Sequence, residues 1–251
     1  MAEEPLPLQL DEEEKPGGST PAPFSPPAPS EVFLALNRSL TPRWRQCYGP
    51  VATPPPVERE QGSLLLGVYG TECLIASFAR DPQHAAQILS DSAAIEKVLG
   101  IAETVRGRHQ RLQALAAADE WESFRRETDA LQQERCAALI EQRDAALSRL
   151  LPAGAWMRAM ETEAALLAAD KKSETSFVSI HPSTLDWLDA EISSLDAASQ
   201  SLRSISRCRT VSKRLRKLIV LPANASRETV QQRRAAIAEA LQETVARFHK
   251  P

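Results

Sequence analysis

Residues 183–221 have the sequence STLDWLDAEISSLDAASQSLRSISRCRTVSKRLRKLIVL, the most regularly patterned stretch of the chain. Its apolar side chains recur at intervals of three and four residues, with an interruption at Ser199. They are Leu185, Leu188, Ile192, Leu195, Leu202, Ile205, Cys208, Val211, Leu215 and Leu218. Such intervals place apolar residues on one face of an α-helix, so we predict a single long helix that begins at the cap residue Ser183 and ends before Pro222.

Basic residues cluster in the second half of this predicted helix. No Asp or Glu occurs between Asp196 and Glu228, although the whole chain has a formal net charge of −3. The predicted patch for an anionic partner or for nuclear import consists of Arg207, Arg209, Lys213, Arg214, Arg216 and Lys217. Because the apolar side chains of this segment share one face, the basic side chains occupy the remaining surface and are left for a partner.

Four explanations fit the patch. The first is that the basic residues form the solvated outer face of an amphipathic helix. The second is that Lys213–Arg216 form a nuclear import signal. The patch would also neutralise phosphates of DNA or RNA through residues 203–227, although no aromatic residue is interleaved to stack on bases. An acidic protein segment, including the acidic N-terminus of this chain, would be an equally suitable partner.

The helical period continues on both sides of residues 183–221. We predict a helical or coiled-coil region over residues 81–172, capped at its start by Asp81, with one helix ending at Pro152 and Gly154, and a C-terminal helix over residues 226–250. The apolar stripes are mostly narrow. The predicted fold is therefore mostly α, with elongated amphipathic helices in a coiled coil or an antiparallel bundle that complete their core with other helical subunits, as a homo- or hetero-oligomer.

Proline dominates the N-terminal part of the chain. Thirteen of the 18 prolines lie in the first 56 residues, so we predict a disordered Pro-rich arm over residues 1–60. Within this arm, residues 31–40 have helical spacing and predict a short helix that docks on a partner through Val32, Phe33, Leu36 and Leu40. Four Ser/Thr-Pro pairs are candidate phosphorylation sites in a eukaryotic host, at Thr20, Ser25, Thr41 and Thr53.

A short apolar segment at residues 61–80 separates the arm from the helical region. The stretch 63–79 is apolar apart from Glu72 and contains two glycines. A membrane-spanning helix needs about 20 apolar residues, and this stretch is shorter and contains a charged residue. We therefore predict that it does not span a membrane. We expect instead a short buried segment, extended at first and helical from the cap residue Thr71 onward.

Motifs of catalysis are absent from the sequence. It contains no nucleotide-binding, hydrolase or metalloprotease motif, and its four cysteines and four histidines are too scattered for a metal or nucleophilic site. We therefore predict no enzymatic activity and no cofactor. The acidic N-terminus is unlike a signal peptide, which predicts an intracellular protein, nuclear or cytoplasmic.

The predicted function is a non-enzymatic helical scaffold or adaptor subunit of a multiprotein assembly, with a basic patch for an anionic surface. The alternative is a nucleic-acid- or chromosome-associated protein that binds through the basic stretch 203–227.

Overall fold

A computed structural model of the chain describes residues 24–49, 58–170, 176–220, 222 and 225–249. These residues form ten α-helices and one 3-10 helix and contain no strand, which confirms the mostly α fold class. The elements in chain order are α1 (Pro29–Ser39), η1 (Trp44–Cys47), α2 (Arg59–Ala79), α3 (Pro82–Leu99), α4 (Ala102–Ala117), α5 (Trp121–Glu141), α6 (Ala145–Ala169), α7 (Pro182–Ser193), α8 (Ala197–Ser201), α9 (Arg203–Leu218) and α10 (Arg227–Phe248).

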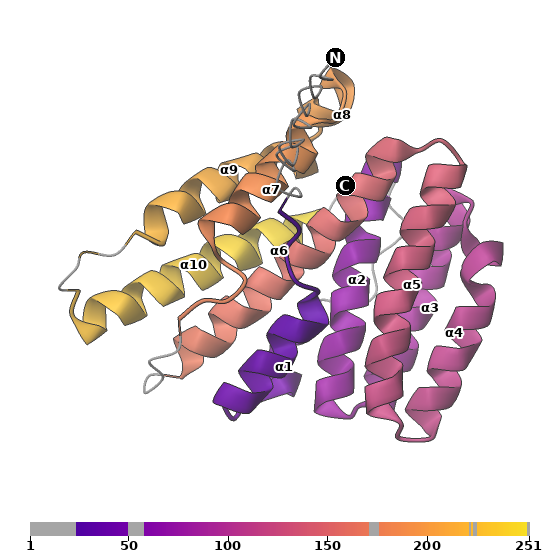
Figure 1. Cartoon of the computed structure of the whole chain (residues 1–251), viewed down its shortest axis with the longest axis horizontal. Helices are drawn as coiled ribbons and strands as arrows, with labels where there is room; N and C mark the ends of the chain where they lie inside the picture. The colour runs from indigo at the N-terminus through magenta and orange to yellow at the C-terminus, as the bar shows by residue number, and fades with distance from the viewer. Residues whose placement is uncertain (1–23, 50–57, 171–175, 221, 223–224, 250–251) are drawn as a thin grey trace, which may run out of the picture.

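The helices form two groups. Helices α2 to α5 stand side by side with short turns between them, and α6, α7, α9 and α10 run obliquely to that group (Figure 1). Helix α6 joins the groups, because it packs against α2 and α5 on one side and against α10 on the other. Of the two predicted arrangements, the chain therefore adopts an antiparallel bundle, and one continuous apolar cluster fills its centre.

The apolar stripes that were expected to bind other subunits are filled within this chain. Leu185 and Leu188 of α7, Leu215 of α9 and Leu241 of α10 are fully buried against neighbouring helices. A bundle buries each helical face against several neighbours, so even narrow stripes find apolar cover without a second chain. The burial of these residues is therefore explained without the partner subunits that we predicted from the narrow stripes.

Helix α2 corrects the expectation for residues 61–80. The segment is one continuous helix from Arg59 to Ala79, with no extended part, and Thr71 lies in its interior instead of capping it. Among the described residues it is the one helix long and apolar enough to span a membrane by length and composition, and 89% of that apolar window is buried inside the protein. Neighbours on all sides give α2 the burial of a core helix.

Small residues let α2 and α6 approach closely. A Cβ on Gly67 would overlap the carbonyl oxygen of Leu151, and a Cβ on Gly154 would overlap that of Leu64. The Thr71 hydroxyl donates to the carbonyl oxygen of Ala155 at 3.0 Å. Backbone contact at this crossing explains why glycine occupies both positions.

The predicted helix end at Pro152 and Gly154 is wrong, because α6 continues through both residues. A proline leaves the carbonyl four residues earlier without its helical donor. Here that carbonyl belongs to Ser148, and the thiol of Cys136 on α5 donates to it at 3.6 Å. A donor from a neighbouring helix thus compensates for the interruption.

The single long helix predicted for residues 183–221 is instead three helices, α7, α8 and α9. Helix α7 begins at Pro182 and is capped by His181, not Ser183. The Asp196 side chain accepts from the Ser199 amide at 2.8 Å and starts α8, and Leu202, with ψ 139°, turns the chain into α9. The chain bends at this break, and α9 packs back against α7. The cap at the start of α8 favours a new helix more strongly than the continuing apolar period favours a single long one.

The predicted N-terminal arm is partly ordered. Helix α1 matches the helix expected at residues 31–40, but Val32, Phe33 and Leu36 are buried in the core of this chain and Leu40 is half-buried. The apolar face that was expected to dock on a partner therefore packs against α2 and α6. Residues 1–23 and 50–57 of the predicted arm lie outside the described residues.

Candidate functional site

Helix α9 carries the predicted basic patch and lies between α7 and α10. Its apolar residues Ile205, Cys208, Val211 and Leu215 are buried, so the packing fixes which side of the helix faces solvent. The six predicted patch residues fall on the flanks and on the outer side, and they are not equivalent.

Two of the six basic side chains are engaged within the chain. Arg216 binds Asp186 at 2.7 Å and Asp189 at 2.8 Å, both on α7, and hydrogen bonds to Asp189 and then Asp186 raise the pKa of its guanidinium. Arg209 donates to the Gln200 side chain at 2.7 Å. These two residues are tied to the fold and are less available to a partner.

The other four, Arg207, Lys213, Arg214 and Lys217, form what we call the α9 basic face. Lys213, Arg214 and Lys217 are exposed and Arg207 is half-buried. None of the four makes an ion pair with an acidic side chain of the described residues. Four neighbouring cations without a counter-ion keep a local positive potential on a chain whose net charge is −3.

A groove between α9 and α10 extends this face. Arg207 and Arg214 line it from α9, and Glu243 and Arg247 line it from α10, around a cavity of about 130 Å³. Arg247 was missed at the sequence level because it is 33 residues beyond Arg214 and only the antiparallel packing of α9 and α10 brings them together. Glu243 is the one carboxylate among the residues that line the groove.

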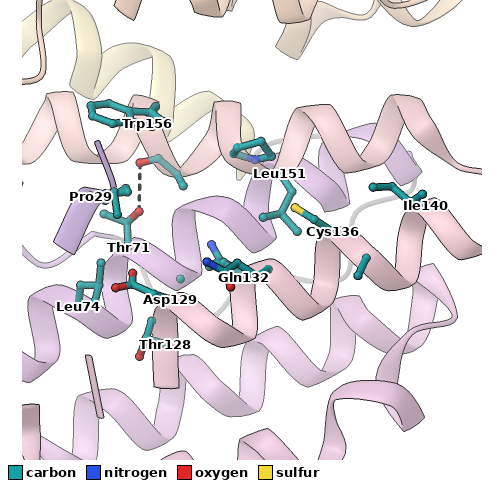
Figure 2. A pocket seen from close by; sticks show the side chains of 16 residues that line it. Pro29, Thr71, Leu74, Thr128, Asp129, Gln132, Cys136, Ile140, Leu151 and Trp156 are labelled. Atoms are coloured by element: carbon teal, nitrogen blue, oxygen red, sulfur yellow. Dashed lines mark hydrogen bonds between the residues drawn. The ribbon is translucent and has the colours of Figure 1, made fainter. Parts of the chain in front are cut away.

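A larger apolar cavity of about 430 Å³ lies between α2, α5 and α6, beside the start of α1 (Figure 2). Two of its polar lining groups already have partners in the protein: Asp129 accepts from Ser30 at 2.7 Å, and the Thr128 hydroxyl donates to the Phe124 carbonyl at 2.9 Å. Burial raises the pKa of the Asp129 carboxyl. An occupant would be held by apolar contact with residues such as Ile140, which is 60% exposed.

Cys136 lines the same cavity, and its thiol is not activated. Burial raises the pKa of this thiol to about 11, so at neutral pH it stays protonated and does not act as a nucleophile. The protonated form is the one that donates to the Ser148 carbonyl beside Pro152. This cysteine therefore has a structural use in α6.

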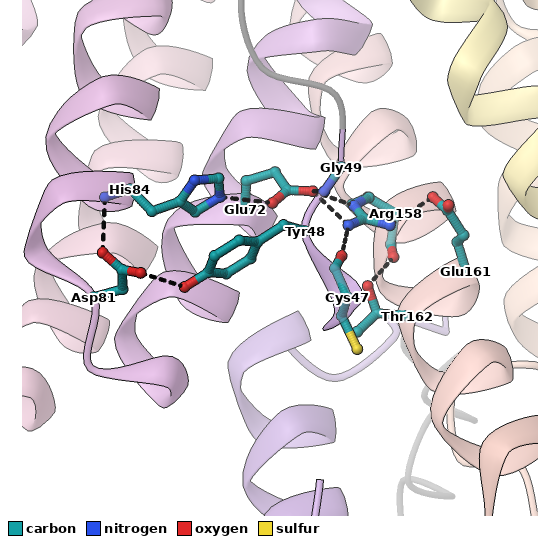
Figure 3. A network of polar contacts seen from close by, with 9 residues as sticks. All are labelled: Cys47, Tyr48, Gly49, Glu72, Asp81, His84, Arg158, Glu161 and Thr162. Carbon is teal, nitrogen blue, oxygen red and sulfur yellow. Dashed lines mark hydrogen bonds and ion pairs between the residues drawn. The ribbon is translucent and has the colours of Figure 1, made fainter. Parts of the chain in front are cut away.

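A network of buried polar groups joins η1 to the bundle (Figure 3). The Arg158 guanidinium of α6 lies 2.5 Å from the Glu72 carboxylate of α2, and both side chains are at most 3% exposed. Arg158 also donates to the Cys47 carbonyl, and Glu72 accepts from the Gly49 amide at 3.0 Å. The pair thus holds the chain at the end of η1, at Cys47 and at Gly49.

The outer half of this network contains the side chains that most resemble a catalytic group. The Tyr48 and His84 rings stack at 3.7 Å, His84 lies 3.5 Å from Glu72, and the Tyr48 hydroxyl lies 3.1 Å from Asp81. Burial raises the pKa of Tyr48. Burial alone would also raise the pKa of Glu72, but Arg158 and His84 lower it below its usual value. Neither group is tuned to exchange protons near neutral pH, which favours a structural role.

The candidate phosphorylation sites divide into two sets. Ser25 and Thr41 are exposed, Thr41 directly after α1, whereas Thr20 and Thr53 lie outside the described residues.

In the part of the chain that the structure describes, no group of three or more His, Cys, Asp or Glu side chains is placed to hold a metal ion.

Comparison of the chain with protein-family models, with curated protein sequences and with solved structures finds no match.

Proposed function

We propose that this chain is a non-enzymatic helical adaptor that binds an acidic segment of a partner protein through the α9 basic face. One observation carries the proposal: Arg207, Lys213, Arg214 and Lys217 have no acidic partner among the described residues, while Arg216 beside them is paired with two aspartates. A folded surface normally mixes both signs of charge, so an unpaired cationic face is a candidate contact for an anion.

The spacing of the face suits an extended acidic segment. Arg207 and Arg214 are seven residues apart, which at 1.5 Å per residue is about 10 Å along α9. An extended peptide covers that distance in about three residues, so a short run of Asp and Glu would meet several of the cations at once. Salt screens exposed charges over about 8 Å at physiological ionic strength, so these closely spaced cations attract an acidic segment together only when it lies close to them.

The site of partner contact differs from the one expected from the helical stripes. Those stripes are filled in the bundle, so the proposed adaptor role depends on surface charge and not on coiled-coil seams. Nucleic acid is the competing partner, and the same charges would neutralise its phosphates.

Fluorescence anisotropy tests the proposal with two labelled probes, a short peptide rich in Asp and Glu and a DNA duplex. The first variant reverses the four face residues to Glu. A matched control reverses four exposed cations elsewhere, so that the net charge change is equal. The control residues are Arg38, Arg43, Lys97 and Arg143.

We expect the wild-type chain and the control to bind the acidic peptide, with affinity falling as salt rises, and the face variant to lose about tenfold or more. Equal losses in both variants would mean that net charge alone matters and would refute the face as a site. Tighter binding of DNA than of the peptide would favour the nucleic-acid function instead.

A further inference from the structure

A separate cavity of about 390 Å³ lies at the N-terminal end of α9. Three arginines line it, Arg203 and Arg207 from the first two turns of α9 and Arg247 from the last turn of α10. None of the three makes an ion pair with a described residue, and the one carboxylate that lines the cavity is that of the exposed Glu58. The cavity therefore has an excess of positive charge, supplied by opposite ends of the consecutive helices α9 and α10.

A buried hydroxyl group also lines this cavity without a partner. Ser204 is 7% exposed, and its Oγ atom has no hydrogen-bond partner among the described residues. Buried hydroxyl groups in folded proteins are almost always hydrogen-bonded, because losing water without a replacement costs free energy. Because the Oγ atom is itself buried, an acceptor group bound in the cavity would become its partner through a rotation of the Ser204 side chain.

Several helix termini meet at the cavity. No side chain caps the first turn of α9, a helix of 16 residues, and none caps the start of α2, a helix of 21 residues. Glu58 is the residue directly before α2, so the N-terminal ends of both helices adjoin the cavity. The C-terminal ends of α8 and α10 lie at the same cavity, so the helix dipoles largely offset one another and the positive charge of the cavity comes from the three arginines.

We infer that this cavity binds the phosphate group of a phosphorylated serine or threonine in the acidic segment of the partner. The inference rests on the proposed function, because Arg207 belongs both to the α9 basic face and to the cavity. A phosphate monoester carries nearly two charges and three acceptor oxygens on one centre, which suits guanidinium groups that converge. A nucleic acid carries one charge per phosphate in a row, and no aromatic side chain lines the cavity to stack on a base.

The test compares two labelled acidic peptides that differ only in one phosphoserine. The structure predicts that the wild-type chain binds the phosphorylated peptide about tenfold more tightly than the unphosphorylated one. Ser204→Ala should reduce that ratio by about threefold or more, and Arg203→Gln combined with Arg247→Gln should abolish it. Thermal denaturation identifies any variant that is not folded, and Ser204→Ala changes the fold least because it removes only an unbonded hydroxyl.

A matched control replaces Lys213 and Lys217, which lie on α9 outside the cavity, by Gln. This control should weaken both peptides equally and leave the ratio unchanged. If both peptides bind equally and Ser204→Ala has no effect, the phosphate site is refuted while the basic face stands. If neither peptide binds, both the phosphate site and the proposed function fail. If a single-stranded oligonucleotide displaces the phosphopeptide more effectively than inorganic phosphate does, a nucleic-acid partner replaces the phosphoprotein.

Discussion

Replacing Arg158 by methionine is a direct test of how the N-terminal segment is held on the bundle. The wild-type guanidinium is 3% exposed, lies 2.5 Å from Glu72 and 2.8 Å from Glu161, and donates to the Cys47 carbonyl. Methionine fills a similar volume without charge, which leaves the buried Glu72 carboxylate with only Gly49 and His84 as polar neighbours. Breaking a buried pair in this way costs about 3–5 kcal/mol of unfolding free energy.

The double variant Glu72→Gln with Arg158→Met separates the ion pair from the loss of packing. It removes the buried Glu72 charge but leaves Glu161, whose side chain is 12% exposed, without its counter-ion, so we expect it to recover part of the loss and to be more stable than Arg158→Met alone. Urea denaturation followed by circular dichroism measures both values. The chain has four tryptophans, so the difference in fluorescence between each protein and its Trp44→Phe counterpart isolates the signal of Trp44, which stacks on Phe78 at 4.8 Å and reports whether η1 detaches first.

The loss of unfolding free energy caused by Arg158→Met should depend on pH. In the wild type, burial alone would raise the pKa of Glu72, but Arg158 and His84 lower it, so the stabilisation is present above the unfolded pKa and is lost as pH falls through the folded one. Without Arg158, burial dominates and the pKa rises, so the free-energy gap between variant and wild type should narrow from pH 7 to pH 5. A loss below about 1 kcal/mol, or a double variant no more stable than the single one, would refute the reasoning.

Two further predictions concern the helix crossing and the C-terminal end. Gly67→Ala places a methyl group on the Leu151 carbonyl and should cost about 1–3 kcal/mol, whereas Gly107→Ala faces open space in α4 and should gain about 0.5–1 kcal/mol; thermal melts of both variants with the same sign would contradict the close crossing. Burial lowers the pKa of His249 from 6.5 to about 4, so the unfolded chain binds this proton first and stability should rise with pH between those values. The gain is about 1 kcal/mol from pH 5 to pH 7 after allowance for partial exposure, and a His249→Gln variant with the wild-type slope in urea titrations at those pH values would disprove it.

Features that depend on neighbouring residues in the sequence could be predicted. Asp81 caps α3, and Ser226 accepts from the Thr229 amide at 3.1 Å at the start of α10, both as their residue types and positions indicated. The apolar stripes also identified core residues, among them Leu185, Leu188 and Ile192 of α7. Local signals suffice here because a cap or a stripe is encoded within a few turns of one helix.

Features that depend on contacts with another helix could not be predicted from the sequence. The Ser148 carbonyl that Pro152 leaves without a helical donor has the Cys136 thiol of α5 as a neighbour, and the burial of α2 requires neighbours from several other helices. The same is true of the candidate site, where the sequence indicated a cluster of cations but could not separate Arg216, paired with aspartates of α7, from Arg214, which has no acidic partner among the described residues. It also could not place Arg247 beside the cluster.

The difference between Arg214 and Arg216 is the most direct test of the central claim that the unpaired cations of α9 form a binding surface. Affinity for the acidic peptide and unfolding free energy are measured for Arg214→Gln and for Arg216→Gln. We predict that Arg214→Gln weakens binding about threefold to tenfold and leaves stability unchanged, because its guanidinium has no acidic partner to lose. Arg216→Gln should leave binding nearly unchanged and lower stability, since Asp186 and Asp189 lose their counter-ion. Equal effects of both substitutions on binding, or a loss confined to Arg216→Gln, would contradict the account.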